Sequence, residues 1–141
     1  MDLIESRKET IREFQAELLK LEQVEPPTDH HFSDGMYGRV MHMPAGMVVS
    51  GRTHRKDHLF IVCKGAIRIA TDEGSVLLTA PAVIETKAGA KRVLYAVEES
   101  ACMTVHKTDL TDIAAIEEDV LEPEPVMLFG PGNKLKALEA K

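Results

Sequence analysis

Two kinds of hydrophobic periodicity divide the chain into a helical beginning, a strand-rich middle and a mixed end. Between residues 2 and 23, apolar side chains recur at spacings of 7, 3, 4 and 3 positions, which is typical of one helix face. This seam consists of Ile4, Ile11, Phe14, Leu18 and Leu21. Asp2 and Glu5 form a candidate capping box, and Pro26-Pro27 ends the helix. The pattern predicts an N-terminal amphipathic helix and linker over residues 1–27.

The predicted N-terminal helix has two interpretations of equal weight. Its apolar seam either packs against its own domain or pairs with the helix of another subunit. Three heptads are short for a coiled coil that is stable by itself. The sequence therefore leaves the two interpretations open.

From Met36 to about Lys107 the pattern changes to short strands separated by turn signals. The candidate strands are 36–43, 46–50, 57–63, 66–71, 75–79, 82–86, 91–97 and 101–107. Asp72-Glu73-Gly74 is typical of a hairpin turn. Because no helical pattern interrupts the strands, we expect an all-β jelly roll or small barrel over residues 28–107. The polar stretch 28–35, which contains His30 and His31, is predicted to be a solvated loop.

One candidate strand is apolar on both of its faces. Side chains alternate across a strand, so His58, Phe60 and Val62 share one face. The opposite face carries Leu59, Ile61 and Cys63. A strand that is apolar on both sides needs cover on both sides. We therefore expect self-association, as a dimer or larger assembly, through the outer sheet face together with the N-terminal helix and the C-terminal arm.

The C-terminal part, 108–141, is predicted to be a helix and an extended arm. The apolar stripe of the helix, over 108–122, is formed by Ile113, Ile116, Val120 and Leu121. Thr108 or Thr111 is the candidate N-cap, and Pro123 stops the helix. An apolar run over 126–129 follows, and we expect it to dock on the barrel or to add to a neighbouring sheet edge.

Composition narrows the class of protein. The chain has 141 residues, 44% of them hydrophobic, which is enough for one domain with a single core. Its formal net charge of −6 argues against a nucleic-acid-binding protein. No apolar run is long enough for a membrane span, and the beginning of the chain lacks an apolar signal core, so we expect a cytoplasmic protein. Cys63 and Cys102 are both interpreted as small buried hydrophobes, and a disulfide between them is left open.

A polar cluster precedes the strand at 57–63, within the stretch Gly46–Gly65. Its glycines and its three polar side chains, Arg52, His54 and His58, resemble in their spacing the first motif of the cupin superfamily. A second cupin motif is much weaker: Gly89 matches it, and Arg92 stands where that motif has a histidine. The resemblance covers about residues 36–107 and implies a jelly-roll barrel.

The resemblance also carries an expectation for the site. Metal-binding cupins use three His and one Glu, and those four places hold Arg52, His54, His58 and Arg92 in this chain. A guanidinium cannot coordinate a metal but forks well onto a carboxylate or phosphate. We therefore expect no cofactor, and a barrel interior lined by these four side chains and Tyr95 that binds a small anionic molecule without turning it over.

Two alternatives remain. In the first, the protein is a metal-dependent cupin enzyme, such as an isomerase, a lyase or a dioxygenase-like protein. A divalent ion (Zn, Fe, Mn or Ni) would then be held by His54, His58, Glu85 and His106. In the second, the barrel is a rigid block in a structural assembly, comparable to accessory proteins of bacterial viruses and associated with the virion.

Overall fold

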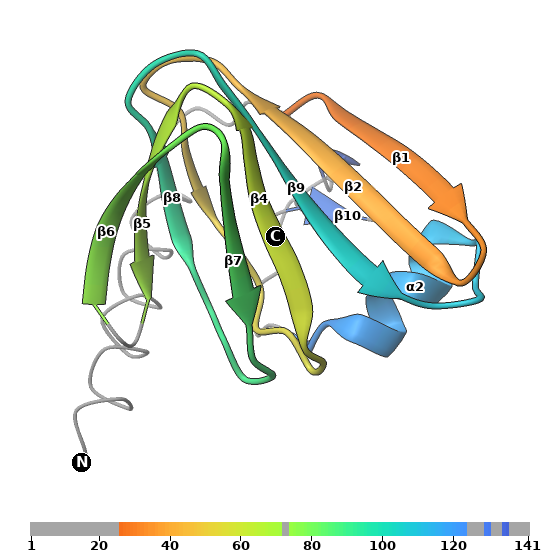
Figure 1. Ribbon diagram of the computed structural model, residues 1–141. Coiled ribbons are helices and arrows are strands. Elements are labelled where there is room, and N and C mark those ends of the chain that lie inside the picture. The colour runs from red at the N-terminus through yellow and green to blue at the C-terminus, as the bar shows by residue number, and fades with distance from the viewer. Residues whose placement is uncertain (1–25, 72–73, 124–128, 131–133, 136–141) are drawn as a thin grey trace, which may run out of the picture.

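The computed structural model describes residues 26–71, 74–123, 129–130 and 134–135. Within these ranges the chain is built mainly of strands, with one short helix after them (Figure 1). The strands of the barrel are β1 (Thr28–Ser33), β2 (Met36–Met43), β3 (Val48–Ser50), β4 (His58–Lys64), β5 (Ala66–Thr71), β6 (Gly74–Thr79), β7 (Ala82–Thr86), β8 (Val93–Ala96) and β9 (Ser100–Lys107). The helix, α2, spans Ile113–Val120. The predicted helix over 2–23 lies outside the described residues.

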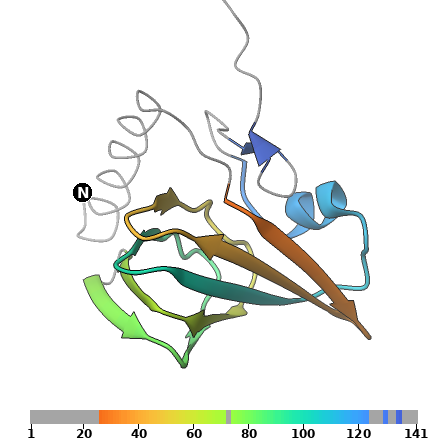
Figure 2. The same ribbon diagram turned by 90° about the horizontal axis from the view of Figure 1, so that it is seen from above.

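The strands form two antiparallel sheets that face each other. One sheet has the order β1-β2-β9-β4-β7 and the other has the order β3-β8-β5-β6. Seen from above, the two sheets curve around a common interior, and α2 lies at the far end of the longer strands (Figure 2). The predicted all-β jelly roll is therefore confirmed.

The candidate strands match the observed ones closely. Three of them, 36–43, 66–71 and 82–86, have the same bounds as β2, β5 and β7. β5 and β6 pair from Thr71 and Gly74 onward, and residues 72–73 of the expected turn lie outside the described residues. In each case, period-2 alternation and nearby turn residues determine the strand.

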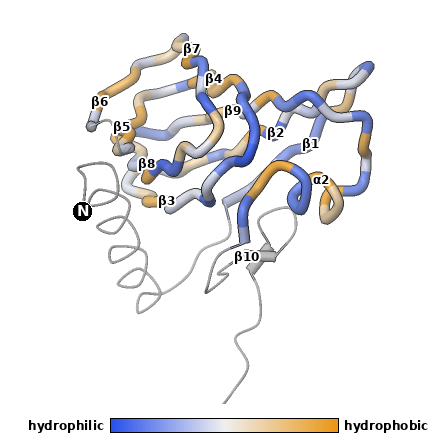
Figure 3. The backbone as a smooth tube through the Cα atoms, turned by 90° about the horizontal axis from the view of Figure 1, so that it is seen from below, coloured by the Kyte–Doolittle hydropathy of each residue, from blue (hydrophilic) through white to orange (hydrophobic). Residues whose placement is uncertain are grey.

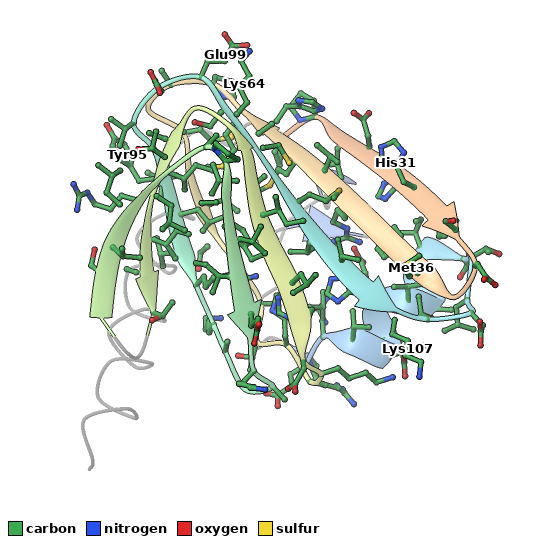
Figure 4. The ribbon with its side chains drawn as sticks, in the orientation of Figure 1. His31, Met36, Lys64, Tyr95, Glu99 and Lys107 are labelled. Atoms are coloured by element: carbon green, nitrogen blue, oxygen red, sulfur yellow. The ribbon has the colours of Figure 1, made fainter. Side chains whose placement is uncertain are left out.

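The loop predicted over 28–35 is wrong, because residues 28–33 form the edge strand β1. β1 pairs with β2 through a tight turn at Asp34-Gly35, whose φ angles are 32° and 78°. Asp-Gly is a typical hairpin dipeptide because both of its residues accept positive φ. The strand is polar because one of its faces meets solvent. His31 lies on that outer face (Figure 4).

The core fills the end of the barrel away from α2 and is mainly aliphatic. It consists of Met43, Phe60, Val62, Ile67, Ile69, Leu94, Ala96 and Cys102. A second, smaller cluster joins α2 to β2 through Tyr37, Ile116, Val120 and Leu121. Figure 3 shows α2 with hydrophobic residues in its first half and hydrophilic residues after them.

The helix is shorter than the predicted range 108–122. Its N-cap is Asp112, whose carboxylate accepts a hydrogen bond of 3.0 Å from the backbone N–H of Ala115, so neither Thr108 nor Thr111 is the cap. The hydroxyl of Thr108 accepts instead from the N–H of Leu110, at 3.1 Å, in the turn before the helix. A carboxylate is among the strongest N-caps, which explains why the helix begins after Asp112.

The two cysteines lie on opposite sides of the larger sheet. Cys102 is buried in the core, whereas Cys63 is exposed, and both thiols are free. The interpretation of Cys63 as a buried hydrophobe is therefore wrong. A β-bulge between Val62 and Lys64 shifts the register of β4 against β9 at this point.

The C-terminal arm is described only in part. Phe129–Gly130 (β10) pairs with Lys134–Leu135 (β11). Most of the apolar run at 126–129 lies outside the described residues, so its predicted docking remains a prediction. In the described part of the chain, no helix is both long and apolar enough to cross a membrane.

Gly65, the last glycine of the motif, is required by the backbone. Its φ angle is 77°, and a Cβ there would overlap the carbonyl oxygen of Glu99 and the hydroxyl of Ser100. Gly46 has a similar φ of 86°, but nothing lies within 4 Å of a Cβ placed there. A Cβ would therefore meet backbone strain at both glycines, but steric overlap only at Gly65.

We expect Gly65→Ala to lower the free energy of unfolding by roughly 3 kcal/mol or more, because it adds overlap to backbone strain. Gly46→Ala, the matched control, adds strain alone and should cost about 1 kcal/mol. Urea denaturation of both variants measures the difference. Equal losses would contradict the close approach at Gly65.

Candidate functional site

Three histidines, two at or just before the start of β4 and one from the distant strand β9, stack at the end of the barrel that faces α2. His54 lies in the loop before β4, His58 begins β4, and His106 lies near the end of β9. The ring centroids of His54 and His58 are 4.1 Å apart, those of His58 and His106 are 4.9 Å apart, and those of His54 and His106 are 5.7 Å apart. The interplanar angles are 27°, 29° and 9°, so the rings lie face to face.

The hydrogen bonds of His58 assign its tautomer. Its Nδ1 lies 3.2 Å from the backbone carbonyl of Lys56, which can only accept, so Nδ1 carries the proton. Its Nε2 lies 3.0 Å from Nη2 of Arg92, and a guanidinium can only donate. Nε2 is therefore the acceptor, and His58 is a neutral imidazole with both nitrogens engaged.

Burial keeps the whole cluster neutral. It is the main reason why the pKa of His54 falls to about 2, with the charge of His58 as the next cause. Burial, followed by the nearby Arg92, lowers the pKa of His58 to about 4. Burial and then His58 lower the pKa of His106 to about 3. Each imidazole resists a positive charge because low dielectric and other cations surround it.

Arg92 is buried beside the histidines without a carboxylate partner. Its side chain is 7% exposed, and burial lowers its pKa to about 10. Nη1 donates to the hydroxyl of Thr86 at 2.9 Å, and the guanidinium carbon lies 4.5 Å from the ring centroid of Phe60. Among the described residues, no Asp or Glu forms an ion pair with Arg92.

A second polar network extends from the cluster toward α2. The Tyr37 ring stacks on His106 with centroids 6.2 Å apart. The Tyr37 hydroxyl accepts from Nε of Arg39 at 2.8 Å and lies 2.6 Å from Nδ1 of His30. Arg39 also forms a salt bridge with Glu117 of α2. Unlike Arg92, therefore, Arg39 has a carboxylate partner.

Arg52 lies outside the predicted interior site. Its Nε and Nη2 donate to the backbone carbonyl of Glu122 at 3.1 and 2.9 Å. Arg55 donates in the same way to the carbonyl of Leu121 at 2.9 Å, and Lys56 forms a 2.7 Å ion pair with Asp119. The two arginines bind carbonyls that have no helical hydrogen-bond partner at the end of α2. All three positive charges lie near the C-terminus of α2, where the helix dipole is negative. The expectation that Arg52 lines the interior is therefore corrected.

The other predicted site residues divide between the two sides of the sheets. His54, His58, Arg92 and His106 come together. Tyr95 is exposed and points away from the barrel (Figure 4). Glu85 is exposed opposite Leu59 on the outer face, whereas its neighbour Thr86 faces inward opposite His58. Neither Tyr95 nor Glu85 joins the cluster, because strand register assigns them to the outer face.

The sequence did not indicate that Thr86, Phe60 and the Tyr37–Arg39–Glu117 network are parts of this region. The only signal for Thr86 was its parity in the strand 82–86. That parity became informative once Thr86 was paired with His58. Glu117 comes from α2, and nothing in its local sequence indicates that it meets Arg39 of β2.

The residues present do not fit a divalent metal ion. Among the described residues, no group of three or more His, Cys, Asp or Glu is arranged to hold one. Nitrogen lone pairs lie in the ring planes, so stacked rings do not direct them to one point. His58 has both nitrogens engaged, and Arg92 adds a positive charge 3.0 Å from its Nε2. The alternative ligand set also loses Glu85, which faces outward.

Comparison with known proteins supports the fold and no closer relationship. No family model and no curated protein matches the chain. A cupin superfamily protein from Desulfitobacterium hafniense is 17% identical over 63% of this chain and 84% of its own, with a TM-score of 0.51. KdgF from Halomonas sp. is 15% identical over 63% of this chain and 87% of its own, with a TM-score of 0.52.

A cupin 2 conserved barrel domain protein from Salinispora arenicola is similar too, at 13% identity over 60% of this chain and 78% of its own, with a TM-score of 0.52. The chain has the cupin fold. The resemblance drawn from Gly46–Gly65 is thus confirmed for the fold. Identities this low carry no residue roles, so the cupin site must be interpreted from this chain's own contacts.

We expect the stability of this cupin barrel to fall as the pH is lowered from 6.5 to 5. The folded pKa values of His54, His58 and His106 lie below that range, whereas unfolded histidines titrate near 6.5. The unfolded chain therefore binds protons that the folded chain excludes. The free energy of unfolding should decrease by up to about 1.4 kcal/mol per pH unit for each of the three histidines.

Urea denaturation at several pH values between 7.5 and 5 measures this dependence, in a range that lies above the titration of most carboxylates. His106→Phe removes one of the three groups and should make the slope shallower by about 1.4 kcal/mol per pH unit. A stability that stays constant between pH 6.5 and 5 would show that the histidines titrate normally in the folded protein.

Proposed function

We propose that this cupin barrel binds a small anionic molecule beside Arg92, without converting it. One observation carries the proposal: a guanidinium is buried at the polar end of the barrel with no carboxylate partner among the described residues. Removing a charge from water costs several kcal/mol unless an opposite charge compensates it. An anionic ligand would supply that compensation.

The donors of the cluster suit a carboxylate or phosphate. Arg92 uses Nη1 and Nη2 on Thr86 and His58, and a guanidinium has five N–H groups in all. The neutral imidazoles of His54 and His106 offer further hydrogen bonds to a hydroxyl or an acid group. The site would then select by charge at Arg92 and by hydrogen-bonding pattern at the histidines.

Binding without turnover is favoured by the state of the nearby side chains. Burial raises the pKa of Cys102 to about 12, so its sulfur remains a thiol, which is a poor nucleophile. The neutral histidines have pKa values far below 7, which makes them weak general bases. The metal-dependent enzyme remains the second candidate, with a donor set that fits a metal poorly.

We expect inorganic phosphate or citrate to raise the melting temperature of the protein in a saturable way, by mass action on the folded state. Arg92→Met should weaken this anion binding about 10-fold or more, because a charge-assisted hydrogen bond contributes about 1.5–3 kcal/mol. Thermal unfolding and isothermal titration calorimetry measure the effect. Arg68→Met is the matched control, because Arg68 is exposed on β5.

Two outcomes would contradict the anion site. One is an anion effect that is equal in Arg92→Met and Arg68→Met. The other is stoichiometric divalent metal in the freshly purified protein that is lost in a His54→Ala/His58→Ala variant. The anion-free Arg92→Met protein should unfold within about 2 kcal/mol of the parent, because relief of the buried charge offsets two lost hydrogen bonds.

We propose further that the barrel works as a dimer or larger assembly, with a second copy of the chain on the outer face of the larger sheet. The pairing register places a row of apolar residues across that face: Val83, Ile61, Met103 and Val40. Leu59 of β4 and Val105 of β9 pair with each other next to this row and extend the apolar surface. A contiguous apolar surface of this kind is typical of an interaction site.

Leu59→Lys/Val83→Lys should shift the protein to the monomer, because each lysine adds a charge to the proposed interface. The control is Leu77→Lys/Val76→Lys on β6, since Leu59 and Val83 are 39% and 63% exposed and Leu77 and Val76 are 44% and 47% exposed. Light scattering after size-exclusion chromatography measures the mass. A parent protein that is monomeric at micromolar concentration, or an effect only in the β6 variant, would remove this proposal.

A further inference from the structure

The outer face of the smaller, four-stranded sheet carries a row of mainly apolar side chains. Strand pairing aligns Val48, Tyr95, Arg68 and Leu77 from β3 across to β6, and we call this surface the smaller-sheet face. Their neighbours along each strand pack in or against the core, so these four side chains point outward. Tyr95 and Leu77 are 42% and 44% exposed. The described helix, α2, packs against Tyr37 of the other sheet and does not cover this face.

Segment 1–25, which lies outside the described residues, joins the barrel close to the edge of this face. The carbonyl of Pro27 accepts a hydrogen bond of 2.8 Å from the N–H of His42, near the end of β2. β2 continues through a short loop into β3, which is an edge strand of the smaller sheet. As a helix, residues 2–23 would be about 33 Å long, whereas the three strand spacings of the face are about 14 Å. The segment is therefore long enough to cross the face within its own chain.

The sequence of the segment matches an apolar face that has acidic residues beside it. Its seam places Phe14, Leu18 and Leu21 within two helical turns. In the same heptad pattern, Glu17 and Glu22 stand on either side of the seam. Three heptads are too short to be stable without a partner surface. The seam therefore needs an apolar surface, and the residues beside it favour a surface that carries a cation.

Charge favours the smaller-sheet face over the outer face of the larger sheet. Segment 1–25 has seven acidic and four basic side chains, so its net charge is negative. Arg68 stands within the smaller-sheet face, and no Asp or Glu of the described residues forms an ion pair with it. The larger sheet instead presents Glu85, opposite Leu59, on its outer face. An acidic segment is therefore directed toward Arg68 and away from Glu85.

From its attachment, its apolar seam and its charge, we infer that segment 1–25 packs on the smaller-sheet face of its own barrel. The seam contacts Val48, Tyr95 and Leu77, and an acidic side chain next to the seam lies beside Arg68. This arrangement leaves the outer face of the larger sheet open to a second copy of the chain. It is also independent of the anion site, because neither Arg92 nor the histidine cluster takes part in it.

Tryptophan fluorescence tests the inference, because the chain contains no tryptophan of its own. Tyr95→Trp introduces one fluorophore into the smaller-sheet face, and the docked segment should shield it from acrylamide. Adding Phe14→Gln/Leu18→Gln makes the seam polar while keeping a good helix former. The quenching constant should then rise about 2-fold or more, because the apolar contact is lost. Glu9→Gln/Glu13→Gln, away from the seam, is the matched control and should leave the constant unchanged.

A second probe and the protein mass separate this inference from other arrangements. Val83→Trp places the fluorophore on the outer face of the larger sheet, where the seam variant should change nothing. Quenching at position 95 should be the same between about 1 and 50 μM protein, because docking within one chain does not follow mass action. Light scattering should give the seam variant the mass of its parent.

Three results would overturn the inference. A response at position 83 in place of position 95 would assign the segment to the larger sheet. Quenching that depends on protein concentration, or a lower mass of the seam variant, would assign it to another subunit. No response at position 95 would show that the segment does not cover this face, and that any cover comes from another occupant, such as the apolar run over 126–129.

Discussion

The contact between the guanidinium of Arg92 and Nε2 of His58 determines the chemistry of the polar end of this barrel. It places a permanent positive charge inside the protein and occupies the lone pair that His58 would need for a metal. The same charge contributes to the low pKa values of His54, His58 and His106. A cluster that could coordinate a cation on another scaffold is therefore organised around a cation that the chain itself supplies.

Closure of this end by the C-terminal segment strengthens the effect. Backbone hydrogen bonds join Arg55 to Val120 and Glu122 to Thr53, and His54 forms a bridge with Leu121. Arg52 and Arg55 bind the carbonyls that the end of α2 leaves free. Excluding water lowers the local dielectric constant. Electrostatic interactions near the histidines are therefore stronger than at the surface, and an unpaired polar group there costs more free energy.

The chain has the cupin fold, and the polar residues that this fold brings together in the described part of the chain do not fit a divalent metal ion. Gly65 is required because the backbone needs a positive φ and no Cβ at that point, whatever the barrel binds. Arg52, by contrast, lies outside the interior and binds a backbone carbonyl after the end of α2. The residues that the backbone requires and the residues that determine the chemistry of the site are thus different ones. For this reason, a fold shared at 13% to 17% identity does not establish the function, which has to be argued from the site.

The sequence by itself determined the strands, most of their bounds and the position of the polar cluster before β4. Alternation, turn residues and glycine spacing are local signals, and local signals survive in a single sequence. It also indicated His54, His58 and Arg92 as parts of one site. His106 was indicated only as part of an alternative ligand set. The tertiary structure decided that His106 and Thr86 join the cluster, and that Arg52, Glu85 and Tyr95 do not. That choice depends on strand register and on where α2 ends, and a shift of one residue reverses which side chains face inward.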